Sequence, residues 1–128
     1  MNKISWAKTA IRHKDNCEKI LGFSKEIRYA GVFNQYGRTI SGKIRPGIKP
    51  IFSPNTTREE FFAIASVLRL REKTTKSLGK LEYVLINHKK INILLFYKNQ
   101  TTYYITINSK TIPSQNLINK IKKLIIQG

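Results

Sequence analysis

Residues 27–44 constrain the fold of this chain most strongly, because they carry the pattern of a β-hairpin. Side chains in residues 27–33 alternate between two faces, which is the period of a strand, and a second alternating stretch begins at Thr39. Residues 34–37 between them read Asn-Gln-Tyr-Gly. Asn at the first position and Gly at the fourth favour a type I turn followed by a left-handed residue, which glycine adopts without strain. The stretch is therefore predicted to form two antiparallel strands.

Three more strands are predicted near the C-terminus, at residues 81–88, 91–97 and 101–108, with short turns between them. The middle strand, INILLFY, is almost continuously apolar, which indicates a strand covered on both faces. The last strand alternates between two sets of side chains. These strands and the hairpin are expected to share one sheet.

Residues 57–78 form the clearest helical pattern. Thr56 or Thr57 followed by two glutamates predicts a capping box, and Leu78-Gly79 predicts the end of the helix. Apolar residues recur at helical spacing and predict a buried stripe. The stripe comprises Phe61, Ile64, Ala65 and Leu68, widened by Phe62, Val67 and Leu70.

Residues 2–23 are also predicted to be helical, as one helix or two. Asp15, with Glu18 three residues later, resembles an N-cap, so the firm helix is expected at residues 16–21 and is stopped by Gly22. Trp6 is predicted to anchor in the core. At the other end of the chain, Pro113 and Ser114 are expected to open a helix that runs to about residue 126.

Residues 43–55 contain three prolines spaced four residues apart, which is incompatible with a helix or a central strand in this stretch. An extended loop across one edge of the sheet is therefore expected. Three cations in it, Lys43, Arg45 and Lys49, are predicted to point outward.

The predicted element order is helix, two strands, helix, three strands, helix. This order favours an α+β fold with a single five-stranded antiparallel sheet and helices packed on it. Residues 15–128 are expected to form that domain, and residues 1–14 are expected to form a basic helical extension, since they include Lys3, Lys8, Arg12 and Lys14. No internal repeat or linker divides the chain.

The composition favours a cytoplasmic protein. No apolar run approaches the roughly 20 residues that span a bilayer, and charges interrupt the N-terminal stretch where a signal peptide needs apolar residues. The single cysteine, Cys17, excludes an intramolecular disulfide and is expected to be a small core residue.

The formal net charge of +17 has more than one explanation. A cationic surface attracts nucleic acids, other polyanions or an acidic protein partner. A genome rich in A/T codons would equally add lysine, isoleucine and asparagine to exposed positions. If the charge is functional, the candidate polyanion-binding residues are Arg69, Arg71, Lys73, Lys76 and Lys80, together with Lys43, Arg45 and Lys49.

No pattern of catalytic or metal-binding residues stands out. His13 and Cys17 are four residues apart, but two ligands do not make a zinc site. The seven carboxylates include no pair with an acid–base spacing, and no phosphate-binding glycine pattern occurs. No catalytic, metal-binding or cofactor-binding residue is therefore predicted, and the protein is not expected to be an enzyme.

The predicted element order resembles that of Roadblock/dynein-light-chain domains, which have a profilin-like fold. Three segments also resemble a small archaeal family of unknown function: residues 17–21 (CEKIL), residues 27–32 (IRYAGV) and residues 36–38 (YGR). The Roadblock resemblance implies a non-enzymatic module that dimerises through its central helix and a sheet edge. It also implies small GTPases, or motility and signalling complexes, as partners.

The leading hypothesis is thus a homodimeric scaffold or regulatory module whose interface lies in residues 57–79 and 81–88. Its candidate interface residues are Phe62, Val67, Leu70, Tyr83 and Leu85. A small nucleic-acid-binding protein is the alternative hypothesis. A ligand-sensing module would require a polar-lined pocket, for which the sequence offers no evidence.

Overall fold

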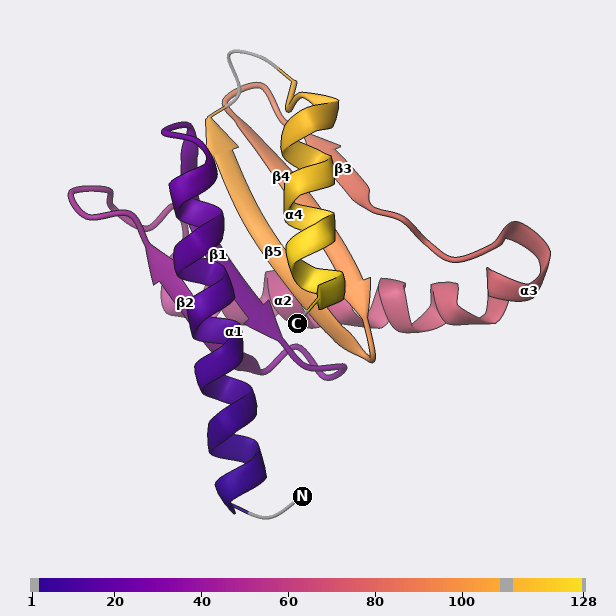
Figure 1. Cartoon of the computed structure of the whole chain (residues 1–128). Coiled ribbons are helices and arrows are strands. Elements are labelled where there is room, and N and C mark those ends of the chain that lie inside the picture. Colours follow the sequence, from indigo (N-terminus) through magenta and orange to yellow (C-terminus); the bar gives the residue numbers. More distant parts are fainter. Residues whose placement is uncertain (1–2, 109–111, 128) are drawn as a thin grey trace.

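A five-stranded antiparallel sheet with helices on both faces organises the computed structural model, which describes residues 3–108 and 112–127 (Figure 1). The strand order across the sheet is β2-β1-β5-β4-β3. The strands are β1 (Ile27–Phe33), β2 (Thr39–Ile44), β3 (Val84–Asn87), β4 (Ile91–Lys98) and β5 (Thr101–Asn108). The helices are α1 (Lys3–Phe23), α2 (Pro54–Arg71), the 3-10 turn η1 (Glu72–Thr74), α3 (Thr75–Leu78) and α4 (Gln115–Gln127). The predicted fold class is confirmed.

The β1–β2 hairpin forms as its turn sequence predicts. The Asn34 side-chain oxygen accepts the backbone N–H groups of Tyr36, at 2.9 Å, and Arg38, at 3.0 Å. Gly37 has a φ of 82°, a left-handed conformation that favours glycine. The asparagine therefore fixes the turn, and the glycine allows it to close.

Helices α1 and α4 cover one face of the sheet, which we call the closed face (Figure 1). The core between them and the sheet includes Ile20, Ile105 and Ile121, all with no exposed surface, and Cys17 is buried there as predicted. The Tyr103 hydroxyl accepts the Asn16 side-chain N–H, at 2.9 Å, and lies 2.7 Å from Nδ1 of His13. These polar groups are buried, and they are paired with one another.

Helix α2 crosses the opposite face, which we call the open face (Figure 1). The predicted stripe of Phe61, Ile64, Ala65 and Leu68 is buried against the sheet. The residues expected to widen this stripe are more than half exposed, because they point away from the sheet: Phe62, Val67 and Leu70. The Phe61 ring centroid is 4.6 Å from that of Phe33 and 4.9 Å from that of Tyr104. The Tyr104 hydroxyl also donates to a Glu60 carboxylate oxygen at 2.9 Å. Aromatic packing and this hydrogen bond attach the first half of α2 to β5.

The N-terminal helix differs from the prediction of a firm helix at residues 16–21. Helix α1 is continuous, so Asp15 lies inside it and does not cap it, and Gly22 is followed by a further helical residue. The polar stretch stays helical because His13 and Asn16 bond to Tyr103 on the sheet. The core prediction for Trp6 is wrong: its side chain is 59% exposed, since α1 extends beyond the sheet there (Figure 1).

The central helix begins earlier than predicted. Ser53, rather than Thr56 or Thr57, is its N-cap: the Ser53 hydroxyl accepts the Thr56 N–H at 3.2 Å, and Pro54 opens the first turn. The α-helix gives way to η1 at Glu72, and α3 then ends at Gly79, which has a φ of 83°. The predicted stop is therefore right, but residues 57–78 are not one continuous α-helix. The strand predicted at residues 81–88 is confined to β3.

The proline-containing loop, residues 45–53, runs over the open face from β2 to α2, and we call it the strap. The prediction that Arg45 points outward is wrong. Its Nε donates to the Ile27 carbonyl at 2.8 Å, and Nη2 donates to the carbonyls of Leu21, at 2.5 Å, and Ser24, at 2.8 Å. A cation at carbonyls near the C-terminus of α1 is electrostatically favourable. Arg45 therefore secures the start of the strap.

Candidate functional site

Helix α2 has a second apolar face, directed away from the sheet. Phe62, Val67 and Leu70 follow one another at spacings of five and three residues and are 59%, 56% and 61% exposed. Ala63 is also exposed, and Ser66 is partly buried between these larger side chains. A surface helix normally has one apolar stripe and a polar opposite face. The outward face of α2, residues Phe62, Ala63, Ser66, Val67 and Leu70, therefore has the character of an interaction surface.

Charged residues stand at the two ends of this outward face. Glu59 lies three residues before Phe62 on α2, and Lys73 lies three residues after Leu70, in the 3-10 turn η1 that continues from α2. Both are exposed. The Ser66 hydroxyl donates to the Phe62 carbonyl at 2.9 Å, which satisfies its hydrogen bonding within the helix. The residue at the centre of the face, Ser66, is thus small, and its hydroxyl is paired within the helix. The two ends of the face carry opposite charges.

The β3 edge lies next to this helix in the chain. β3 pairs with β4 on one side and is the last strand of the sheet on the other. Leu85 packs on the closed-face core, and the Tyr83 ring centroid is 6.4 Å from that of Phe96, which belongs to the same core. The predicted interface residues therefore form two groups: Phe62, Val67 and Leu70 lie on the outward face of α2, and Tyr83 and Leu85 lie on the closed-face side of the β3 edge.

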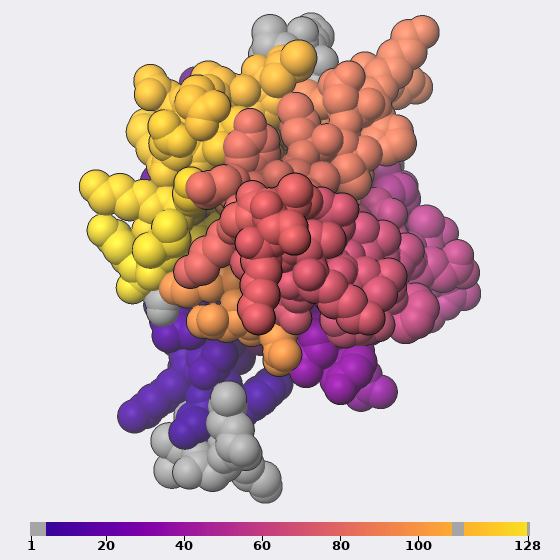
Figure 2. All heavy atoms as spheres, turned by 90° about the vertical axis from the view of Figure 1, so that its right-hand side faces the viewer, coloured from indigo at the N-terminus to yellow at the C-terminus, as the bar shows by residue number. Residues whose placement is uncertain are grey.

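Four of the candidate cations form an exposed basic segment after the outward face. They are Arg71, Lys73, Lys76 and Lys80, in and after the C-terminal end of α2. Figure 2 shows this part of the chain at the centre of one side of the molecule. Glu72, the acidic residue within the segment, accepts the Tyr97 hydroxyl.

Arg69 differs from these four cations because it binds the hairpin turn. Its Nη1 donates to the Gln35 carbonyl, and its guanidinium carbon is 5.9 Å from the centre of the Tyr36 ring. The other predicted cations lie elsewhere. Lys43 is exposed on β2, at the sheet edge opposite β3, Arg45 is bound to carbonyls, and Lys49 is on the strap. The structure thus separates the predicted polyanion-binding residues into different surfaces.

Cys17 is not an activated nucleophile in this structure. Burial, together with the nearby charge of Glu18, raises the pKa of Cys17 to about 12, so the thiol stays protonated near neutral pH. Residues 3–108 and 112–127 include no cluster of three or more His, Cys, Asp or Glu side chains that would hold a metal ion. Within these same ranges, no helix combines the length and apolar character needed to cross a membrane.

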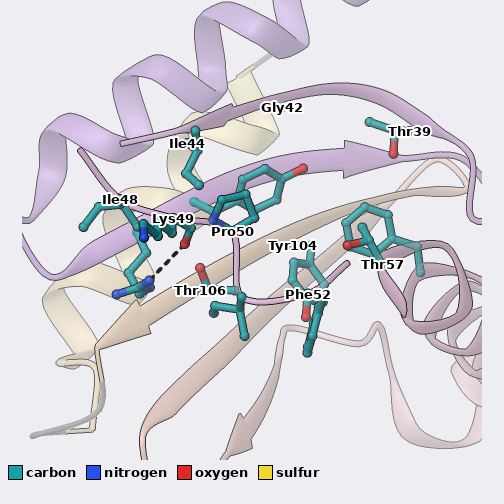
Figure 3. Close-up of a pocket in the computed structure, with 14 residues that line it drawn as sticks. Thr39, Gly42, Ile44, Ile48, Lys49, Pro50, Phe52, Thr57, Tyr104 and Thr106 are labelled. Atoms are coloured by element: carbon teal, nitrogen blue, oxygen red, sulfur yellow. Dashed lines mark hydrogen bonds between the residues drawn. The ribbon is translucent and has the colours of Figure 1, made fainter. Parts of the chain in front are cut away.

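A cavity under the strap is the feature that the sequence reasoning missed. Its volume is about 400 Å³, and Figure 3 shows its walls coming from β1, β2, β5, the strap and the start of α2. The walls are mostly apolar, with Ile44, Ile48 and Phe52 among them, but Arg28 and Thr106 also line it. The spaced prolines and isoleucines of the strap are visible in the sequence, but no local pattern shows which strands face them.

No protein-family model and no curated protein matches the chain. Solved structures do match, among them a Roadblock/LC7 domain from Streptomyces avermitilis, with a TM-score of 0.67 and 8% identity over 89% of this chain and 92% of that one. The gliding protein MglB from Thermus thermophilus matches with a TM-score of 0.70 and 10% identity over 92% and 88%. Profilin II from Acanthamoeba castellanii matches with a TM-score of 0.56 and 13% identity over 90% and 97%. These similarities show a Roadblock/profilin-like fold.

Proposed function

We propose that this protein is a non-enzymatic, homodimeric scaffold or regulatory module that acts through protein–protein contacts in the cytoplasm. The observation that carries the proposal is that α2 is apolar on both faces. One face is buried on the sheet, whereas Phe62, Val67 and Leu70 on the other are more than half exposed. A second copy of the chain would remove this outward face from water.

The sequence of the outward face fits an antiparallel pair of α2 helices. Phe62 and Leu70 are each four residues from Ser66, and Glu59 and Lys73 are each seven residues from it. If two helices cross at Ser66 in opposite directions, Phe62 of one meets Leu70 of the other, and Glu59 meets Lys73. A small residue at the crossing allows close approach, and opposite charges at both ends favour this register.

The β3 edge would extend this interface. An edge strand presents unpaired N–H and C=O groups, which a second edge strand can pair. Pairing of β3 with its symmetry mate would bring Tyr83 and Leu85 beside the partner on the closed-face side. The same dimer would therefore use both groups of candidate interface residues.

The similarity to Roadblock/LC7 structures supports the part of this proposal that concerns an oligomeric interaction module. Roadblock/LC7 structures share the fold, and one solved MglB structure is described as having a tetrameric arrangement. Similarity at this level of identity concerns fold, and function resides in specific surfaces. A small GTPase or a signalling complex as the external partner of this chain is accordingly an extension of the proposal by fold analogy.

Light scattering coupled to size-exclusion chromatography at micromolar concentration and high salt tests the dimer. The molar mass measured for the wild-type protein is expected to be twice the 14.8 kDa of one chain. Phe62→Glu places a charge within the proposed interface, four residues from the crossing at Ser66, and is expected to give a folded monomer. Ile11→Glu is the matched control, because Ile11 is equally exposed, at 59%, on α1. A monomeric wild-type chain would refute the proposal.

A cysteine at position 66 tests the antiparallel register. Under mild oxidation, Ser66→Cys is expected to form a disulfide-linked dimer, since the two copies of this position face each other at the crossing. The native Cys17 does not interfere because it is buried. Ser77→Cys is the control, an exposed serine on α3 outside the outward face. Equal crosslinking of the two variants would contradict this register.

The exposed basic segment favours a second candidate function, binding of nucleic acid. Replacing Arg71, Lys73, Lys76 and Lys80 by glutamine would test it by fluorescence anisotropy with duplex DNA, single-stranded DNA and structured RNA. The control replaces four dispersed exposed lysines, Lys19, Lys25, Lys120 and Lys123. A dedicated site predicts a much larger loss for the first set. Equal losses, with wild-type dissociation constants of about 10⁻⁴–10⁻⁶ M that weaken steeply with salt, would indicate non-specific attraction.

A further inference from the structure

The cavity under the strap is a built site in the open face. Helix α2 covers only part of this face, and the strap roofs the part beside it (Figure 3). Arg45 holds one end of the strap by three hydrogen bonds to carbonyls, and Ser53 joins the other end to α2 as its N-cap. The cavity volume of about 400 Å³ lies within the range of small-molecule sites, roughly 300–1,000 Å³.

Arg28 and Thr106 line this cavity, and each has one buried polar atom without a hydrogen-bond partner among the described residues. These atoms are Nε of Arg28 and Oγ1 of Thr106. Thr106 is only 4% exposed, and its side chain is on the same face of β5 as Tyr104. The two other nitrogens of the Arg28 guanidinium are used, each at 3.3 Å: Nη1 donates to Oδ1 of Asn108 and Nη2 to the Lys49 carbonyl, the bond drawn dashed in Figure 3. The guanidinium is therefore held in place through both Nη nitrogens, and its Nε–H has no partner among the described residues.

Unpaired polar atoms at an apolar cavity indicate what would occupy it. Leaving a buried donor unpaired is unfavourable, and an arginine carries its positive charge at any physiological pH. An acceptor with negative charge would satisfy the Arg28 N–H and the Thr106 hydroxyl together. The rest of the lining, which includes Ile48, Phe52 and Phe61, would accept an apolar body.

We propose that this cavity binds a small apolar monocarboxylate, whose carboxylate oxygens accept hydrogen bonds from Nε of Arg28 and Oγ1 of Thr106. Two donors match the two oxygens of one carboxylate. A phosphate monoester has more acceptor oxygens and more charge than a carboxylate. Against the apolar walls, some of these oxygens would have no hydrogen-bond donor and some of the charge would have no counter-charge. An uncharged alcohol with an alkyl chain of the same length would contact the apolar walls but would not form an ion pair with the guanidinium. The site is separate from the proposed dimer contacts, which lie on the outward side of α2 and at the β3 edge and include no residue that lines the cavity.

Titration with sodium octanoate, followed by NMR of isotope-labelled isoleucine methyl groups, tests the proposal. The methyl signals of Ile44, Ile48 and Ile51 are expected to shift in a saturable manner, because these residues line the cavity. Those of Ile118 and Ile121, in the closed-face core, are expected to stay in place. 1-Octanol and octyl phosphate, the comparison ligands, are expected to bind at least about tenfold more weakly. Shifts confined to residues outside the cavity, or equal affinity for octanoate and octanol, would overturn the proposal.

Two substitutions separate the cavity from general attraction of anions to a basic protein. Arg28→Gln is expected to weaken octanoate binding by at least about tenfold, and Thr106→Val by about fivefold. Lys43→Gln, which removes one exposed charge from β2 outside the cavity, is expected to leave binding unchanged. Because Arg28→Gln also removes the bonds to Asn108 and Lys49, the isosteric Thr106→Val variant decides the outcome if the first variant folds poorly. Unchanged octanoate affinity in Thr106→Val would remove the assigned carboxylate position.

The dimer variant keeps this proposal separate from the proposed function. Phe62→Glu changes the outward face of α2, and Phe62 does not line the cavity. It is therefore expected to bind octanoate with wild-type affinity even as a monomer. A wild-type monomer that still binds octanoate would refute the dimer and support the cavity site. A wild-type dimer whose methyl signals show no saturable shifts with octanoate would support the dimer and refute the cavity site.

Discussion

The two faces of the sheet differ in how completely the single chain covers them. On the closed face, α1 and α4 bury a continuous apolar core, and the polar residues His13, Asn16 and Tyr103 are paired with one another. On the open face, α2 leaves an apolar side exposed to solvent, and the strap covers a cavity lined by Arg28 and Thr106, each with one buried polar atom that has no partner in the described part of the chain.

This difference between the two faces motivates both proposals. Native proteins pair nearly all of their buried polar groups and rarely leave large apolar patches exposed, so departures from both rules on the same face point to contacts with other molecules. The closed face supplies stability. The open face then carries the proposed cavity for a small carboxylate and the α2 part of the proposed dimer interface, whose Tyr83 and Leu85 part lies on the closed-face side of the β3 edge.

The largest effect on stability is expected from truncation of the closed-face core. Ile121→Ala removes a fully buried side chain of α4 and should lower the free energy of unfolding by about 3 kcal/mol. Urea unfolding followed by circular dichroism measures the loss. Ile126→Ala on the same helix, where the side chain is 59% exposed, should stay within about 0.5 kcal/mol of wild type. Similar losses for the two variants would show that the closed face is not a packed core.

Two neighbouring tyrosines allow the same substitution on opposite faces. Tyr103→Phe leaves His13 and Asn16 buried without their shared partner and should cost about 2 kcal/mol in unfolding free energy. Tyr104→Phe removes the hydrogen bond to Glu60, which is partly exposed and can bond to water, so about 1 kcal/mol is expected. Urea unfolding of both variants gives the comparison. A larger loss for Tyr104→Phe would mean that the polar pairing on the open face is the more important one.

The sequence predicted those parts of the fold that depend on local pattern. The turn at residues 34–37 has one asparagine that bonds the backbone and one glycine with positive φ, and both effects act over a few residues. The buried stripe of α2 was also predictable, because its spacing follows the helical period. For the same reason the exposed Phe62 and Leu70 were named as interface candidates from the sequence.

Features that depend on contacts between distant segments were not predictable. Arg45 resembles any other loop cation in the sequence, and only the fold brings it to the carbonyls of Leu21 and Ser24. Asp15 has the pattern of an N-cap, but tertiary bonds from His13 and Asn16 keep the helix continuous through it. The cavity joins Arg28 on β1 to Thr106 on β5, which are far apart in sequence, so no local pattern marks it.

The smallest expected effect is a pH dependence that belongs to the closed face. Burial, with a smaller contribution from the charge of Arg12, lowers the pKa of His13 from its usual value of 6.5. The unfolded chain therefore binds a proton at this residue at a higher pH than the folded chain does, and the free energy of unfolding should decrease as pH falls below 6.5. Urea unfolding between pH 7 and about 5, where most carboxylates stay ionised, measures this slope. His13→Gln should flatten it, whereas His88→Gln, at an exposed position, should retain it. An unchanged slope in His13→Gln would show that the buried His13–Tyr103 pair does not resist protonation, and that the polar pairing of the closed face is looser than its geometry indicates.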